Sequence, residues 1–160
     1  MICGLDISTS RIGMNIYYKN GNLSYRTYTF KKEQSHKERR QIILSLVNDM
    51  KVKTIFCEEV RLFSFGGTVG KKRNFINVGT MLRLYSILTT LIDNGINVYT
   101  MNSRSWKSRI LKPAGFEQSK EGSVLFVKHK YGIDVNHDVA DAICQSLYAK
   151  KFKNMCKKID

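Results

Sequence analysis

Residues 4–13 read GLDISTSRIG, in which an acidic residue stands inside an apolar run and a polar turn and a second apolar run follow it. Short apolar runs with β-branched residues predict buried strands over residues 1–8 and 12–18, joined by a turn. Asp6 lies in the first of these strands, and burying an unpaired carboxylate costs free energy. Asp6 is therefore a candidate site residue.

The rest of the chain predicts a mixed α/β architecture. Asn20-Gly21 indicates a tight hairpin, because this pair tolerates the positive φ of such a turn. Further strands are expected over 23–30, 54–60 and 96–101, and helices over 42–50, 75–92, 103–111, 119–131 and 137–151. We expect a five-stranded mixed sheet with helices on both faces. It forms one domain over residues 1–160, with a basic tail from about residue 152.

The charge balance points to nucleic acid. The chain has 27 Lys and Arg against 13 Asp and Glu, a formal net charge of +14. Such an excess suits phosphates, with an anionic membrane surface as the alternative. No run of about 18 uncharged apolar residues occurs, so no membrane span is expected. The four cysteines are scattered without a CxxC pair, which argues against a zinc site and suits a cytoplasmic protein.

Further acids stand next to apolar segments. Glu58 and Glu59 follow the run Ile55-Phe56-Cys57, and Asp138 and Asp141 are three apart on a predicted helix, so they share a face. A mixed sheet can bring Asp6 and these segments together, where like charges repel without a cation. Hard oxygen ligands favour Mg²⁺ or Mn²⁺. Each acid taken alone can equally be a turn or capping residue.

Three motifs together resemble a known family. GLDISTSRIG at 4–13, FCEEV at 56–60 and HDVADAI at 137–143 resemble, in order and spacing, the RuvC-type Holliday-junction resolvases of the RNase H-like superfamily, the bacteriophage-encoded branch in particular. The resemblance implies an RNase H-like fold and four catalytic, metal-binding acids. The implied catalytic residues are Asp6, Glu58, Asp138, Asp141, Lys107 and Lys120, with Glu59 and His137 as auxiliary candidates.

The sequence departs from the cellular members of that family at two places. Ser8-Thr9-Ser10 replaces a Pro-Gly turn after the first acid, and Arg61 stands where those enzymes carry an aromatic residue after the glutamate. The second departure removes the aromatic side chain that would act as a wedge at the junction centre. Cleavage with little dependence on local sequence is therefore predicted.

The resemblance also implies a reaction and its partners. The expected activity is metal-dependent nicking of branched DNA, chiefly four-way junctions and also forks, with two Mg²⁺ ions per site, Mn²⁺ as a substitute and no nucleotide cofactor. A homodimer formed through helix 75–92 suits a two-fold substrate. The protein is expected in the cytoplasm, that of the host if a phage encodes it.

Basic and aromatic residues between 60 and 116 predict the DNA-binding surface, because phosphate contacts explain a one-sided charge. Trp106 can stack on unpaired bases or anchor its short helix in the core. The predicted DNA-binding residues are Arg61, Phe63, Phe65, Lys71, Lys72, Arg73, Arg104, Trp106, Lys107, Arg109 and Lys112.

Three alternatives stay open on sequence alone. The first is a branched-DNA-binding module without catalysis, which needs the basic surface but no buried acids. The second is an RNase H-like nuclease that acts on RNA or an RNA–DNA hybrid. The third is an actin-like or sugar-kinase phosphotransferase, whose first strand also carries an acid before a Ser/Thr turn, although such enzymes need two lobes around the nucleotide.

Overall fold

A computed structural model describes residues 1–8, 10–60 and 78–160. Its sheet has the strand order β3-β2-β1-β4-β5-β6. The strands are β1 (Ile2–Ile7), β2 (Arg11–Tyr17), β3 (Leu23–Thr29), β4 (Thr54–Glu58), β5 (Asn97–Met101) and β6 (Lys157–Ile159). β1, β4 and β5 run parallel to one another, and β2, β3 and β6 are antiparallel to their neighbours.

The sixth strand corrects the predicted count of five. Residues 157–159 were expected to belong to a basic tail, because they contain two lysines and no apolar run. In the structure Ile159 pairs with Val98 and Lys157 with Thr100, so backbone hydrogen bonds to β5 create the strand. Local sequence carries little signal for an edge strand of this kind, because its pairing partner lies far away along the chain.

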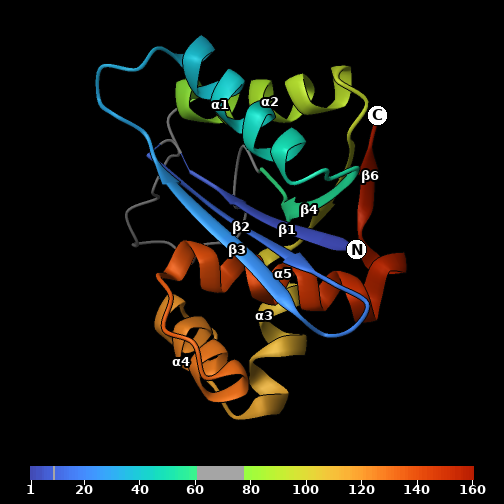
Figure 1. The fold of residues 1–160 in the computed structure, drawn as a ribbon. Coiled ribbons are helices and arrows are strands. Elements are labelled where there is room, and N and C mark those ends of the chain that lie inside the picture. Colours follow the sequence, from blue (N-terminus) through green and yellow to red (C-terminus); the bar gives the residue numbers. More distant parts are fainter. Residues whose placement is uncertain (9, 61–77) are drawn as a thin grey trace, which may run out of the picture.

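The helices cover both faces of the sheet (Figure 1), as expected. The α-helices are α1 (His36–Asp49), α2 (Val78–Asp93), α3 (Ser103–Ile110), α4 (Lys120–Tyr131) and α5 (His137–Phe152), with short 3-10 turns η1 (Lys112–Ala114) and η2 (Lys153–Met155). α1 and α2 pack on one face, and α3, α4 and α5 lie on the other. In the described part of the chain, no helix is long and apolar enough to cross a membrane.

Helix α1 begins earlier than its apolar stripe indicates. Ser35 accepts a hydrogen bond from the Glu38 backbone N–H, and Glu38 in turn accepts one from the Ser35 N–H, which is a capping box. The Ser-x-x-Glu pattern was available in the sequence and places the start of the helix at His36.

Alternation along the central strands separates two cores. Leu5 of β1 and Cys57 of β4 face α1 and α2, whereas Phe56 belongs to the core under α3, α4 and α5. Because neighbouring side chains on a strand point to opposite faces, Gly4 and Asp6 lie on the α5 side. The Asp6 side chain at the end of β1 is thereby directed at α5.

Two glycines allow α5 to lie close against the sheet. A Cβ at Gly4 would come within 1.9 Å of the Ala142 carbonyl oxygen, and one at Gly13 within 2.2 Å of the Asp138 carbonyl group. Any larger residue would push the helix outward. This close approach brings the first turns of α5, with Asp138 and Asp141, next to the end of β1.

Candidate active site

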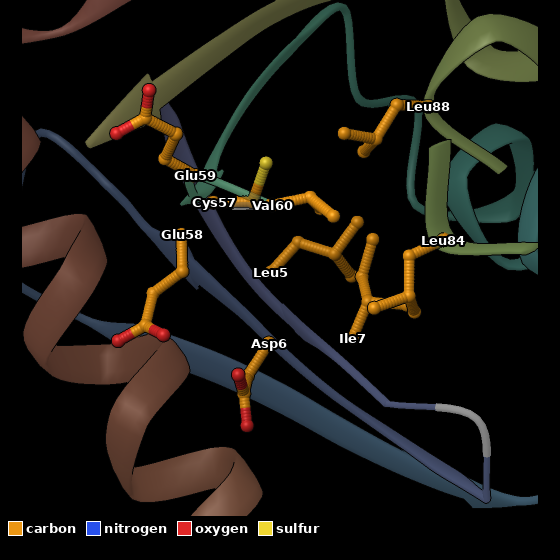
Figure 2. A pocket seen from close by; sticks show the side chains of 9 residues that line it. All are labelled: Leu5, Asp6, Ile7, Cys57, Glu58, Glu59, Val60, Leu84 and Leu88. Carbon is orange, nitrogen blue, oxygen red and sulfur yellow. The ribbon is translucent and has the colours of Figure 1, made fainter. Parts of the chain in front are cut away.

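Four predicted acids gather on the α5 face of the sheet. β1 and β4 are paired in parallel with Leu5 opposite Cys57, so the following residues, Asp6 and Glu58, reach the same edge. Figure 2 shows both of these side chains directed to the α5 side of the strands. Asp138 and Asp141 lie one turn apart on α5 and are both buried.

Glu59 takes no part in this cluster. It is exposed where Glu58 is half-buried, and its side chain points away from that of Glu58 (Figure 2). Its backbone N–H donates to the Met101 carbonyl at 2.9 Å, which extends the β4–β5 pairing by one residue. The period of two along a strand thus separates the two glutamates.

The carboxylates influence one another electrostatically. Burial, followed by the charges of Asp141, Glu58 and Asp138, raises the pKa of Asp6 to about 7, against the opposing effect of Lys120. Burial also raises the pKa of Asp141, whereas the Ser123 hydroxyl and the Lys107 ammonium act in the opposite direction. Lys107 on α3 and Lys120 at the start of α4 therefore lie within electrostatic range of the acids, as expected for site lysines.

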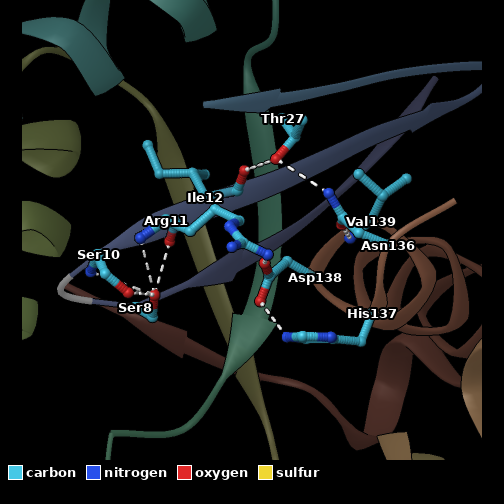
Figure 3. A network of polar contacts seen from close by, with 9 residues as sticks. All are labelled: Ser8, Ser10, Arg11, Ile12, Thr27, Asn136, His137, Asp138 and Val139. Atoms are coloured by element: carbon cyan, nitrogen blue, oxygen red, sulfur yellow. Dashed lines mark hydrogen bonds and ion pairs between the residues drawn. The ribbon is translucent and has the colours of Figure 1, made fainter. Parts of the chain in front are cut away.

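Asp138 is held by two basic side chains. Arg11 Nη1 donates to Asp138 Oδ2 at 3.1 Å, and His137 Nε2 lies 3.5 Å from Asp138 Oδ1 (Figure 3). Arg11 is a site residue that the sequence analysis did not identify, although it stands inside the quoted motif. Its side chain could have been suspected only from the rule that a buried carboxylate needs a partner.

The serine turn positions Arg11. Ser8 Oγ accepts a hydrogen bond from the Arg11 N–H at 2.9 Å and donates one to the Arg11 carbonyl oxygen, also at 2.9 Å. The Ser10 N–H donates to the same hydroxyl at 3.3 Å (Figure 3). The Ser8 side chain thus ties the end of β1 to the start of β2, and it helps to place the first residue of β2 beside α5.

Glu58 has a partner from α3. Trp106 Nε1 donates to Glu58 Oε1 at 2.8 Å, and the tryptophan is completely buried. The hypothesis that Trp106 stacks on unpaired DNA bases is therefore wrong, because its ring has no exposed surface; the alternative of a core anchor holds. The side chain fills the core under α3 and turns its polar edge to the site.

The acidic cluster is a candidate site for a metal ion. In the described residues, no three His, Cys, Asp or Glu side chains are gathered tightly enough to cage an ion as they stand. Their chemistry nevertheless fits a hard divalent cation: every candidate ligand is a carboxylate oxygen, and Asp141 Oδ1 is buried without a hydrogen-bond partner among the described residues. A cation would also relieve the repulsion that raises the pKa of Asp6.

The other predicted DNA-binding residues divide into two groups. Arg104 and Arg109 on α3 and Lys112 on η1 are exposed, and Lys107 is half-buried. The remaining ones lie outside the described residues: Arg61, Phe63, Phe65, Lys71, Lys72 and Arg73.

The chain was compared with known proteins by sequence and by structure. No protein-family model and no curated protein matches it by sequence. Among solved structures, RuvC of Thermus thermophilus matches over 99% of both chains, with a TM-score of 0.67 and 18% identity. The chain has the RuvC fold. T. thermophilus RuvC in complex with a Holliday junction substrate matches with a TM-score of 0.69 and 16% identity, over 99% of this chain and 98% of that one.

The likeness to RuvC confirms the fold class that the three motifs implied. A mixed α/β, RNase H-like sheet is present, with one strand more than predicted. The RuvC fold places the ends of β1 and β4 and the start of α5 in one region, which is where all four implied acids lie.

Proposed function

We propose that the protein is a divalent-metal-dependent endonuclease that nicks branched DNA, chiefly four-way junctions and also forks. The observation that carries this proposal is the convergence of Asp6, Glu58, Asp138 and Asp141 from three separate segments onto one face of a RuvC-like sheet. Nucleic-acid binding alone does not require four carboxylates at one place in a chain of net charge +14. A structural neighbour is a RuvC bound to a Holliday junction, which supports branched DNA as the substrate.

The four acids would hold Mg²⁺, two ions per site, with Mn²⁺ as a substitute. Such ions supply activation of a water molecule and stabilisation of the leaving oxygen in phosphodiester hydrolysis. Lys107 and Lys120 bring positive charge to the carboxylate cluster, where they attract the scissile phosphate and balance the charge that develops on it. Arg11 and Trp106 hold Asp138 and Glu58 in place before the substrate arrives.

The cations of α3 and η1 would bind the DNA backbone. Arg104 and Lys107 are three residues apart on α3 and so lie on neighbouring positions of one helix side, and Lys112 follows on η1. These side chains contact phosphates without reading bases, so recognition would depend on the shape of the branch.

Exposed apolar side chains on α2 support a homodimer. Val78, Leu82 and Tyr85 are 57%, 59% and 46% exposed and follow one another at helical spacing. A stripe of this kind on a soluble chain marks an interaction surface. A two-fold dimer through α2 would present two sites to the two strands that must be cut. We place this enzyme in the cytoplasm, and in that of the host if a phage encodes it.

A cleavage assay tests the proposal. Synthetic four-way junctions, splayed duplexes, linear duplexes and RNA–DNA hybrids are incubated with the protein in Mg²⁺, in Mn²⁺ and in EDTA. Nicking of the junction in either metal, with little cutting of linear duplex and none in EDTA, is expected. Tight junction binding without cleavage would favour the non-catalytic module, and preferred cutting of the hybrid would favour the RNase H-like alternative.

A further inference from the structure

Trp106 combines complete burial with a polar contact to the site. Its indole N–H donates to Glu58 Oε1 at 2.8 Å, whereas the ring packs in the core that also contains Phe56, Met101 and Ile110. Hydrogen bonds to an ionised carboxylate are about twice as strong as those between neutral groups. A purely apolar anchor such as Phe or Leu would fill the same core without this bond.

The same indole ring also touches a site lysine. Lys107 Nζ lies 5.2 Å from the centre of the Trp106 ring, within the range of a cation–π contact. Trp106 therefore contacts both a candidate metal-binding acid on β4 and a candidate phosphate-binding lysine on α3. Its helix is anchored independently, because Asn102 Oδ1 accepts a hydrogen bond from the Arg104 N–H at 2.8 Å at the start of α3.

A tryptophan side chain is well suited to such a task. It has two rotatable side-chain bonds, and when it is fully buried neither can turn without disturbing the core. A carboxylate held at one oxygen by a rigid donor loses rotational freedom and keeps its second oxygen for a cation. The ordering of Glu58 is then complete before metal and DNA bind, which lowers the entropy cost of binding.

We propose that Trp106 is a positioning residue that sets the orientation of Glu58 toward a divalent cation and of Lys107 toward the phosphate. This inference rests on the proposed metal-dependent function and deepens it. Groups that hold a metal ligand from behind typically change metal affinity by about 10–100-fold when they are removed. The indole also gives a spectroscopic probe, because Trp106 is the single tryptophan of the chain.

The first experiment uses the unaltered protein without DNA. Mg²⁺ or Mn²⁺ is titrated while tryptophan emission is recorded, and calorimetry measures metal binding in parallel. We expect the emission to change along the binding curve, and the change to disappear in Glu58→Gln. Metal binding by calorimetry with constant tryptophan emission would overturn the proposal, whether or not any variant folds.

The second experiment compares two core variants. Trp106→Phe keeps an aromatic ring and loses the N–H donor, while Phe126→Leu removes volume from the same core on α4, where the Phe126 ring packs edge-on against Phe116. We expect the dissociation constant for Mg²⁺ to rise about tenfold in Trp106→Phe. It stays unchanged in Phe126→Leu, and four-way junction binding in EDTA is the same in both variants. Equal effects of the two variants on metal affinity would show that Trp106 is only a core filler.

These results separate the inference from the proposed function. Metal binding with the expected tryptophan response, but without cleavage of any DNA substrate, would overturn the nuclease and leave the positioning role of Trp106 intact. Metal-dependent junction cleavage with unchanged metal affinity in Trp106→Phe would overturn the positioning role alone.

Discussion

Arg11 and Asp138 form an ion pair, with 3.1 Å between Nη1 and Oδ2, that joins the first residue of β2 to the first turn of α5. The aspartate is 7% exposed at its side chain and the arginine 37%. Arg11 therefore places one positive charge at the edge of a cluster of four carboxylates. In the absence of a metal ion it offsets part of their mutual repulsion.

Replacing Arg11 by Met should destabilise the metal-free protein. The change leaves Asp138 buried in an acidic cluster without its arginine partner, and the half-open position of Arg11 limits the loss to about 1–2 kcal/mol. Urea denaturation in EDTA measures the loss, and saturating Mg²⁺ should reduce it. Arg26→Met, at an exposed position on β3, is the control. Equal stability of the Arg11 variant and the unaltered protein in EDTA would contradict a stabilising role of the pair.

Three acids of the cluster, Asp6, Glu58 and Asp141, should each be needed for cleavage and not for binding. Asp6→Asn, Glu58→Gln and Asp141→Asn each remove a metal-binding charge while keeping the shape of the side chain. We expect each to slow junction nicking by at least about 100-fold, which corresponds to a few kcal/mol of transition-state stabilisation. Binding to a four-way junction in EDTA, measured by fluorescence anisotropy, should stay the same.

Glu59→Gln is the matched control for the Glu58 variant. Because the Glu59 side chain is exposed and points away from the cluster, nicking should be nearly unchanged. Loss of nicking in Glu59→Gln together with full activity in Glu58→Gln would assign the metal ligand to Glu59 instead of Glu58.

The stability of the metal-free protein should fall as the pH rises from about 4 to about 7. The pKa of Asp6 is about 7 in the fold and 3.8 for an unperturbed aspartate, so the folded state binds the proton more tightly over this range. Below pH 4 Asp6 is protonated in the folded and the unfolded state, so its charge does not destabilise the fold. Above pH 7 it is ionised in both states, and the destabilisation is complete. Asp6→Asn removes the charge and should stabilise the protein at pH 8 by up to about 4 kcal/mol.

Urea titrations at pH 4.5 and pH 8 in EDTA measure this difference. The stabilisation of Asp6→Asn over the unaltered protein should be much larger at pH 8. A difference that is the same at both pH values would contradict the raised pKa. Mg²⁺ at pH 8 should reduce the difference in stability between Asp6→Asn and the unaltered protein, because a bound cation favours the ionised form of Asp6.

A methyl group at Gly13 should displace α5. Its Cβ would lie 2.2 Å from the Asp138 carbonyl group, a contact that requires the helix to move. We expect Gly13→Ala to cost about 1–3 kcal/mol and to reduce nicking, because the shift moves Asp138 away from Asp6. Gly95→Asn, at a positive φ of 78° with open space around it, is the control for thermal unfolding. Unchanged stability of Gly13→Ala would show that α5 can move outward without a loss in the free energy of unfolding.

A charge on the exposed face of α2 should prevent dimer formation. Leu82 is 59% exposed in a single chain and lies between Val78 and Tyr85 on one helix face. Leu82→Glu should give a monomer by light scattering and should uncouple the two cuts on a four-way junction. Leu125→Glu, at a similarly exposed leucine on α4, should leave the oligomeric state unchanged. Identical masses for the Leu82 variant and the unaltered protein would contradict the α2 interface.

Much of the fold could be predicted from local patterns. Apolar runs and period-two alternation predicted β1 to β5, and the helices expected over 119–131 and 137–151 match α4 and α5, whose N-caps are Ser119 and Asn136. These signals are readable because hydrophobic periodicity and helix capping depend on residues only a few positions apart. The position of each acid relative to its strand or helix followed from the same patterns. The hypotheses on Arg61 and on Lys71, Lys72 and Arg73 stay predictions.

Other features depended on contacts between distant parts of the chain. The pairing of Ile159 with Val98 made β6, and the ion pair of Arg11 with Asp138 joined residues 127 positions apart. The sequence alone left two roles for Trp106, base stacking and the favoured role of a core anchor, and its complete burial and 2.8 Å bond to Glu58 decided for the core. An edge strand, a half-buried ion pair and the direction of an aromatic side chain all depend on which surfaces come into contact when the chain folds. The free energy that favours these contacts comes from residues far away in the sequence, which no local pattern contains.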